Sequence, residues 1–137
     1  MDNIIWDSAW DIGNALIDSQ HQHWVEIFNR LHRAVLSDDS VDLDELQEST
    51  LKEILEYTDF HFSSEEGLMA EAAYPEAHRH WRLHKEFTNL VYEKNRDLEN
   101  GDIVLNSGLL SLMKNWLLLH IQVEDQKFGQ YLKTLDR

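Results

Sequence analysis

The chain contains no cysteine, and only 1 proline and 5 glycines among its 137 residues. Without cysteine it cannot form a disulfide, a thiolate zinc site, an iron–sulfur cluster or a cysteine nucleophile, so a bound metal would need histidine and carboxylate ligands. The scarcity of proline and glycine leaves few places for turns, which favours long helices over many short strands. These absences indicate an all-α protein whose metal ligands would be nitrogen and oxygen atoms.

Basic residues are also few, with 12 Lys and Arg against 26 Asp and Glu, for a formal net charge of −14. This charge repels nucleic-acid phosphates and anionic lipids, so we expect neither nucleic acid nor a membrane as a partner. The N-terminus has no signal-peptide pattern, and no run approaches the ~20 apolar residues of a membrane helix. We therefore expect a cytoplasmic protein with a single domain over residues 1–137, in which residues 1–15 form an N-terminal arm.

Apolar residues recur at three- and four-residue steps in the first half of the chain, which is typical of amphipathic helices. The first helix is predicted to follow Asp18 as its N-cap residue. A polar loop is expected at residues 37–40. The second helix then begins near Asp42 or Asp44 and extends for about thirty residues, or ~45 Å.

The second half of the chain continues the pattern. Proline disfavours helix in the residue before it, so Tyr74-Pro75 should separate the second helix from a third over residues 75–100, with Gly101 as its stop. A fourth helix is expected from Ser107, and a short terminal helix after Asp125. The sequence thus predicts an up-down-up-down four-helix bundle with an N-terminal arm and a short C-terminal helix, a fold that can hold metals between facing helices.

Each of the four predicted helices carries histidine on its apolar face. A single histidine at such a position is usually a core residue with a hydrogen-bond partner. Burying several imidazoles without partners, however, would cost on the order of a few kcal/mol each, comparable in sum to the stability of a domain. A metal centre would supply the partner for the five histidines concerned, which are His21, His61, His80, His84 and His120.

Carboxylates are harder to select because acidic residues are so common in this chain. Glu65 lies one turn after His61 on the inward side of the second helix, whereas Glu66 points about 100° away and is expected to be a solvated charge. The remaining histidines, His23, His32 and His78, fall off the inward faces. We expect them at the surface or beside the site.

His120 and Asp125 are five residues apart, which places them about 140° apart on an ideal helix. Both can reach one centre only if the helix is irregular between them, so we predict a break or bulge around Val123-Glu124.

Five imidazoles and two carboxylates are too many for one tetrahedral zinc ion. The repeated Glu-x-x-His of ferritin-like di-iron proteins is also missing. A histidine-rich dinuclear centre fits better.

Several motifs in the chain, in order and spacing, are shared with one family. They are Ile17-Asp18-Ser19-Gln20-His21, then His61-Phe62 with Glu65-Glu66 and Met69, then Tyr74-Pro75 leading to His80, His84 and Phe87, and finally Trp116-Leu117 through His120-Ile121 to Asp125. On these motifs the sequence resembles the hemerythrins, especially their single-domain bacterial members, over nearly its whole length.

The resemblance implies a non-haem centre of two iron ions (Fe2+/Fe3+) joined by a bridging oxo or hydroxo group. In such a centre one iron would be bound by three histidines and the other by two, with two carboxylates bridging them. One coordination position would stay open, on the iron with two histidines, and dioxygen would bind there. The implied ligands are His80, His84 and His120 on one iron, His21 and His61 on the other, and Glu65 and Asp125 as bridges.

The family's pocket wall would be formed here by Phe62, Phe87, Trp116, Leu117 and Ile121. All are apolar, which favours binding over turnover. Two features depart from the family pattern. Phe128 stands where relatives often carry tyrosine, and His78 is an extra imidazole near the third helix's ligands.

The resemblance implies reversible dioxygen binding for storage, delivery or scavenging, not enzymatic activity. The alternative is an oxygen- or redox-sensing domain of a larger, chemotaxis-type signalling protein, fused to or in contact with a signalling module. Turnover of peroxide or nitric oxide at the same irons is a third and less favoured hypothesis, because the wall residues would not assist it.

Overall fold

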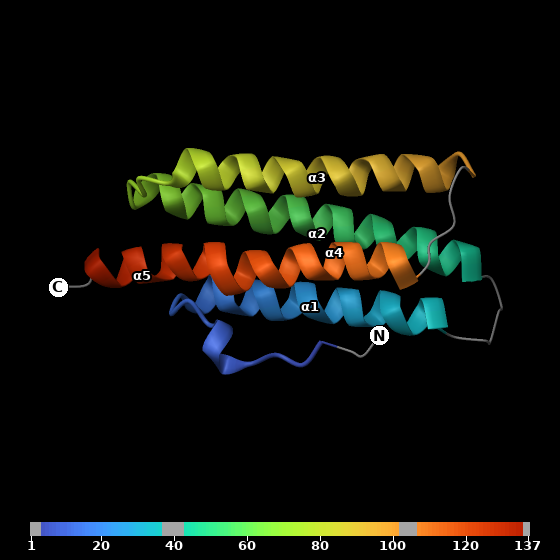
Figure 1. The fold of residues 1–137 in the computed structure, drawn as a ribbon, viewed down its shortest axis with the longest axis horizontal. Coiled ribbons are helices and arrows are strands. Elements are labelled where there is room, and N and C mark those ends of the chain that lie inside the picture. Colours follow the sequence, from blue (N-terminus) through green and yellow to red (C-terminus); the bar gives the residue numbers. More distant parts are fainter. Residues whose placement is uncertain (1–3, 37–42, 102–106, 136–137) are drawn as a thin grey trace.

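Four helical rods lie side by side and alternate in direction (Figure 1). The structure is a computed structural model that describes residues 4–36, 43–101 and 107–135, except the side chains of residues 34–36, 43–48, 50 and 107–108. The first three rods are α1 (Ala15–Leu36), α2 (Leu43–Glu71) and α3 (Ala77–Glu99). The polar loop expected at residues 37–40 lies outside the described residues. The predicted up-down-up-down bundle is confirmed.

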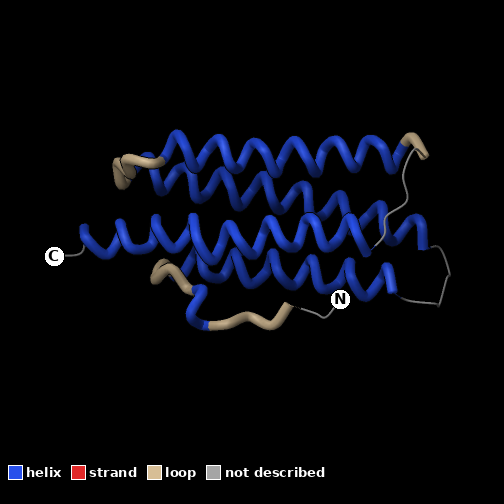
Figure 2. The backbone as a smooth tube through the Cα atoms, viewed as in Figure 1, coloured by secondary structure: helices blue, strands red, loops and turns tan. Residues whose placement is uncertain are grey.

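The fourth rod consists of three consecutive segments: α4 (Ser107–Leu119), the π-helix η2 (His120–Asp125) and α5 (Gln126–Leu135). The expected short terminal helix therefore prolongs the fourth rod instead of folding back on the bundle (Figure 1). Figure 2 shows helices and loops but no strand in the described part of the chain. None of the described helices combines the length and apolar character needed to cross a membrane.

The start of α1 differs from the prediction. Asn14, not Asp18, caps the helix, since its Oδ1 accepts a hydrogen bond from the backbone N–H of Ile17 at 3.1 Å. Asp18 lies in the first turn, and its carboxylate accepts hydrogen bonds from the N–H groups of Ile12 at 2.7 Å and Gly13 at 3.2 Å. Asp18 thus ties the N-terminal arm to α1.

The turn between α2 and α3 falls at Tyr74-Pro75, as expected, but α3 starts at Ala77, two residues later than predicted. Ala73 has a positive φ of 53°, a conformation that ends the preceding helix. At the other end of α3, Gly101 has φ 75° and donates its N–H to the carbonyl of Leu98 at 3.1 Å. Gly101 is therefore the predicted helix stop, because glycine adopts this conformation without a Cβ penalty.

The arm packs on the bundle through its apolar residues and contains the short 3-10 helix η1 (Ser8–Trp10). Ile12 is buried, while Trp6 and Trp10 are half-buried against the core. Inward-facing residues of all four rods form the main core, among them Trp24, Ile54, Phe87 and Met113. A second, smaller apolar cluster contains Ile17, Met69 and Phe128, and buried polar residues lie between the two clusters along α1 and α2.

Candidate metal centre

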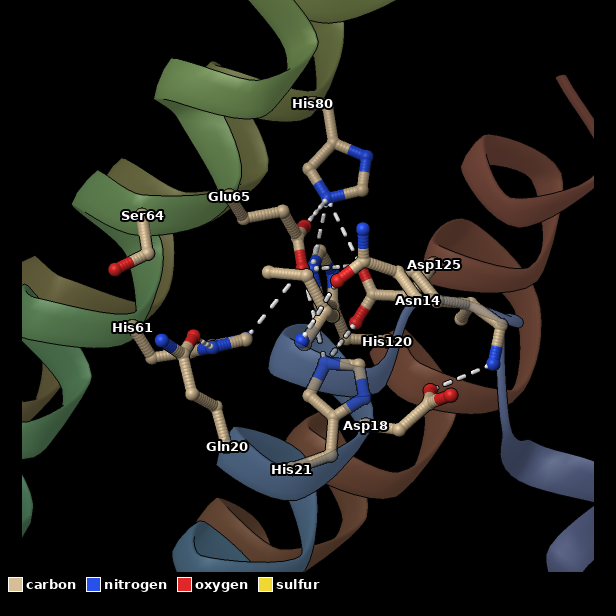
Figure 3. Close-up of polar contacts among 12 residues, drawn as sticks. Asn14, Asp18, Gln20, His21, His61, Ser64, Glu65, His80, His120 and Asp125 are labelled. Atoms are coloured by element: carbon tan, nitrogen blue, oxygen red, sulfur yellow. Dashed lines mark hydrogen bonds and ion pairs between the residues drawn. The ribbon is translucent and has the colours of Figure 1, made fainter. Parts of the chain in front are cut away.

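All seven polar residues proposed as metal ligands are buried in the interior of the bundle, none with more than 3% of its surface exposed. They come from every rod: one from α1, two from α2, two from α3 and two from η2. Figure 3 shows six of the labelled side chains pointing toward one another from these elements. The set is His21, His61, Glu65, His80, His84, His120 and Asp125.

The predicted irregularity between His120 and Asp125 is confirmed. The six residues His120–Asp125 form a π-helix, in which hydrogen bonds connect residues five apart, so the fifth residue returns to the starting side. His120 Nε2 and Asp125 Oδ1 lie 3.1 Å apart as a result. The local widening of the fourth rod allows both side chains to face the same point.

Three histidines meet at one position in the cluster. The Nε2 atoms of His80 and His120 are 3.0 Å apart, and those of His84 and His120 are 3.1 Å apart. Two nitrogen ligands at right angles on one metal ion, each about 2.1 Å from it, are separated by about 3.0 Å. The three imidazoles are therefore spaced like ligands of a common ion.

Ligand atoms within 4.8 Å of one another form two groups. One contains His80, His84 and His120, and the other contains His21 and His61. Both groups also contain the carboxylates of Glu65 and Asp125.

Each shared carboxylate turns one oxygen toward each group. Glu65 Oε1 lies 2.7 Å from His80 Nε2, while Oε2 lies 3.4 Å from His61 Nε2. Asp125 Oδ1 lies 3.0 Å from His80 Nε2, while Oδ2 lies 2.9 Å from His21 Nε2. This arrangement suits two carboxylates that bridge a pair of metal ions.

Several polar atoms in the cluster make no hydrogen bond of acceptable geometry although they are fully buried. They are Nε2 of His21 and His61 and both carboxylate oxygens of Glu65 and Asp125. A buried polar atom without a partner costs about 1–3 kcal/mol, and such atoms are rare unless an ion or water satisfies them. The donor set and its unpaired atoms therefore fit bound cations.

The electrostatics of the cluster point the same way. Burial would lower the pKa of the histidines, but the negative charges of the nearby Asp125 and Glu65 carboxylates outweigh it and raise the pKa of His21 to about 10 and of His80 to about 9. Burial would raise the pKa of both carboxylates, but the surrounding histidines hold each well below its usual range. In metal-free protein the protonated imidazoles of His21 and His80 balance the two buried carboxylates, and bound cations would take over this role.

Two of the histidines have partners on their outer nitrogen that the sequence did not reveal. His61 Nδ1 lies 2.8 Å from Oε1 of Gln20 on α1, and both residues are labelled in Figure 3. His84 Nδ1 lies 2.8 Å from Oε2 of Glu66 on α2. The expectation that Glu66 is only a solvated charge is corrected: its side chain stays 30% exposed, but one oxygen contacts His84, because α3 packs on the side of α2 to which Glu66 points.

Aromatic rings cover two histidines of the three-histidine group. Phe62 stacks on His84 with ring centroids 3.7 Å apart and planes 3° from parallel. Trp116 stacks on His120 at 4.7 Å and 12°, and Phe87 in turn stacks on Trp116 at 4.3 Å. Three of the five predicted wall residues thus shield imidazole rings directly or through one neighbour.

The other two predicted wall residues, Leu117 and Ile121, are fully buried in the main core. A surface cavity of about 190 Å³ opens beside the site, with a mainly apolar lining that includes Leu83, Trp116, Leu119, His120, Val123 and Glu124. Of the predicted wall residues, Trp116 contributes to this lining.

The remaining histidines lie away from the two ligand groups. His23 and His78 are exposed, and His78 stacks on Trp81 at 5.8 Å, so it is not an extra imidazole at the site. The expectation of a surface position is wrong for His32 on α1, which is 6% exposed. Phe128 is fully buried and packs on Tyr74 at 5.0 Å.

The fold and the site define a class: a four-helix bundle with a histidine- and carboxylate-lined metal centre between its helices. The sequence model of the family described as "Hemerythrin HHE cation binding domain" matches residues 12–132. The chain therefore belongs to the hemerythrin family.

Relatives within the family cover most of the chain. It is 32% identical to a bacteriohemerythrin of Stenotrophomonas maltophilia (strain R551-3) over 96% of this chain and 82% of that protein. It is 31% identical to one of Pseudomonas aeruginosa (strain UCBPP-PA14), over 91% and 78% respectively. A crystal structure of wild-type hemerythrin matches the fold with a TM-score of 0.87 at 21% identity, covering 96% of this chain and 98% of that one.

Proposed function

We propose that this chain holds a pair of iron ions in the buried cluster and binds dioxygen reversibly there, for storage, delivery or scavenging. The observation that carries the proposal is the sharing of Glu65 and Asp125 between two histidine groups, with one oxygen of each carboxylate toward each group. Membership in the hemerythrin family supports an oxygen-binding iron protein. Imidazole and carboxylate ligands suit iron, although they also suit other divalent metals.

In this proposal His80, His84 and His120 would hold one iron and His21 and His61 the other, and an oxo or hydroxo group would bridge the pair together with the two carboxylates. When bound, the iron pair supplies the two electrons that dioxygen accepts on binding and gives back on release. Because only two histidines would bind the second iron, one coordination position there would be left for dioxygen.

The chain's own contribution is to orient the ligands and to exclude water. Phe62, Leu117 and Ile121 are at most 4% exposed, and none carries a group that can donate a proton. Stacking of Phe62 on His84 and of Trp116 on His120 fixes the two imidazole planes. A dry, apolar surrounding favours release of unchanged dioxygen over reduction of it, so we propose that the chain is not an enzyme.

The central experiment is anaerobic reduction of iron-loaded protein followed by exposure to air, with iron analysis and visible spectroscopy. We expect two irons per chain, a colourless reduced form and a charge-transfer band that disappears on deoxygenation. Glu65→Ala should lose iron because one of the two shared carboxylates is gone, whereas Glu56→Ala, an exposed position on the same helix, should retain it. Iron-free protein with unchanged stability would falsify the site.

The N-terminal arm favours a sensor as the second candidate function. Its Trp6 ring lies 6.2 Å from the ring of His21, and its Trp10 carbonyl accepts a hydrogen bond from Gln126, the residue after Asp125, at 2.7 Å. A change at the metal site could thus reach the arm, and through it a fused or contacting signalling module. Protease accessibility of the arm in the reduced and oxygenated forms would distinguish the candidates, since a simple carrier should show no difference.

A further inference from the structure

The two metal positions differ in the partners of their histidines. His61, in the two-histidine group, faces the neutral amide of Gln20, whereas His84, in the three-histidine group, faces the carboxylate of Glu66. Both distances are 2.8 Å. The amide oxygen and the carboxylate can only accept, so Nδ1 carries the proton in both rings and Nε2 is left free to bind metal.

The charge of Glu66 acts on His84 in a dry environment. His84 is 1% exposed, and Phe62 covers one face of its ring at 3.7 Å. Hydrogen bonds to a charged acceptor are shorter and stronger than neutral ones, and a carboxylate on the outer nitrogen makes a ligating imidazole more basic. The Glu66 side chain is 30% exposed, so water can solvate it while one oxygen stays on His84.

We propose that Glu66 is a positioning residue that makes the two metal positions unequal: it fixes the ring of His84 and strengthens it as a donor, so that the three-histidine position holds the more oxidised metal more tightly. The redox part of this inference rests on the proposed function, while the metal-affinity part needs only the cluster itself. Gln20 at the other position fixes the His61 ring without adding charge.

The test is Glu66→Gln, which keeps the shape of the side chain and removes its charge. The matched control is Glu56→Gln, the same change at an exposed position of α2. The redox-inert probe is zinc(II), and its affinity is measured by competition with a coloured chelator. Loss of partners of ligating histidines typically weakens metal binding 10–100-fold, so we expect about a tenfold weakening in Glu66→Gln and none in Glu56→Gln.

Two further readouts separate a donor effect from a general loss of structure. In zinc-loaded protein, the Nδ1–H proton signal of His84 should move upfield in Glu66→Gln, while that of His61 stays in place. In iron-loaded protein, the reduction potential should rise in Glu66→Gln and fall in the reciprocal variant Gln20→Glu. Gln20 is only 4% exposed, so Gln20→Glu buries a charge and can fail to fold. In that case the measurements on Glu66→Gln alone test the inference.

The outcomes distinguish this inference from the proposed function. If wild-type protein binds neither zinc(II) nor iron, the metal centre itself is refuted. If wild-type protein binds metal and Glu66→Gln equals Glu56→Gln in zinc affinity, His84 signal and reduction potential, then Glu66 has no such role and the inference is overturned.

Discussion

At Gly129 the backbone of α5 lies close against the N-terminal arm, and we expect Gly129→Ala to destabilise the protein. A Cβ at this position would lie 2.7 Å from Ile12 Cβ and 2.8 Å from the Ile12 carbonyl oxygen, closer than real Cβ contacts. The arm cannot yield easily, because Asp18 accepts a hydrogen bond from Ile12 N–H at 2.7 Å and Gln126 donates one to Trp10 at 2.7 Å. The added methyl group must therefore displace anchored backbone.

The size of the effect follows from two opposing contributions. Overpacking a close contact costs about 1–3 kcal/mol, whereas alanine is up to about 1 kcal/mol better than glycine inside a helix. Because the anchored backbone of Ile12 places the cost in the upper half of its range, we expect a net loss of about 1–2 kcal/mol in the free energy of unfolding. For a domain of this size that corresponds to a fall in Tm of about 3–8 °C.

Gly67→Ala provides the matched control, because Gly67 lies inside α2 and a Cβ there would meet nothing within 4 Å. This variant should gain about 0.5–1 kcal/mol from helix propensity alone. Thermal unfolding followed by circular dichroism should show shifts of opposite sign. If Gly129→Ala melts at or above the wild-type temperature while Gly67→Ala is stabilised, the close approach of arm and helix is not as described.

Three further predictions concern the metal centre. Arg79→Ala should release iron to a chelator several-fold faster, because Arg79 holds the π-helix segment through an ion pair with Glu124 at 2.6 Å. The control Arg30→Ala, which breaks a similar surface pair at 2.8 Å, should release iron at the wild-type rate. Equal rates in the two variants would contradict a role of Arg79 in holding the π-helix. Leu117→Ala should keep its iron but oxidise faster in air, because truncation of a fully buried wall residue lets water enter. Autoxidation is followed by visible absorbance, and an unchanged rate would show that Leu117 does not exclude water from the site. Metal uptake at pH 7 should release protons, because the pKa values of His21 and His80 are raised to about 10 and 9 and a bound metal ion would displace their protons. Metal affinity should therefore rise with pH. Titration calorimetry in buffers of different ionisation enthalpy measures the release, and an enthalpy independent of the buffer would contradict the prediction.

Much of the fold followed from periodicity. Apolar residues at helical spacing located the four rods, and Tyr74-Pro75 and Gly101 located two of their ends, because these signals act within a few residues of the backbone they affect. The start of α1 was misplaced, because Asn14 and Asp18 are both good capping residues. Only the position of the arm decides that Asp18 bonds to Ile12 and Gly13 instead.

The candidate site was predictable to the extent that each residue faces inward on its own helix. Five histidines at inward positions implied a partner, and the spacing of His120 and Asp125 required the irregularity that the π-helix provides. The spacing could not show that Glu65 and Asp125 each turn one oxygen toward one histidine group and the other oxygen toward the other group. This orientation depends on the side-chain torsions of residues from four rods.

The sequence by itself determined the inward position of the seven candidate ligands, because an inward position depends on the angle around one helix axis, and that angle follows from residue number. Only the tertiary structure decided which residues meet across helices. Glu66 was expected in solvent and lies on His84, His32 was expected near the surface and is buried, and Gln20 reaches His61 from a different rod. Such contacts depend on the rotation and axial offset of a neighbouring helix, which are fixed by packing of the whole bundle and leave no signal in the spacing of residues along one helix.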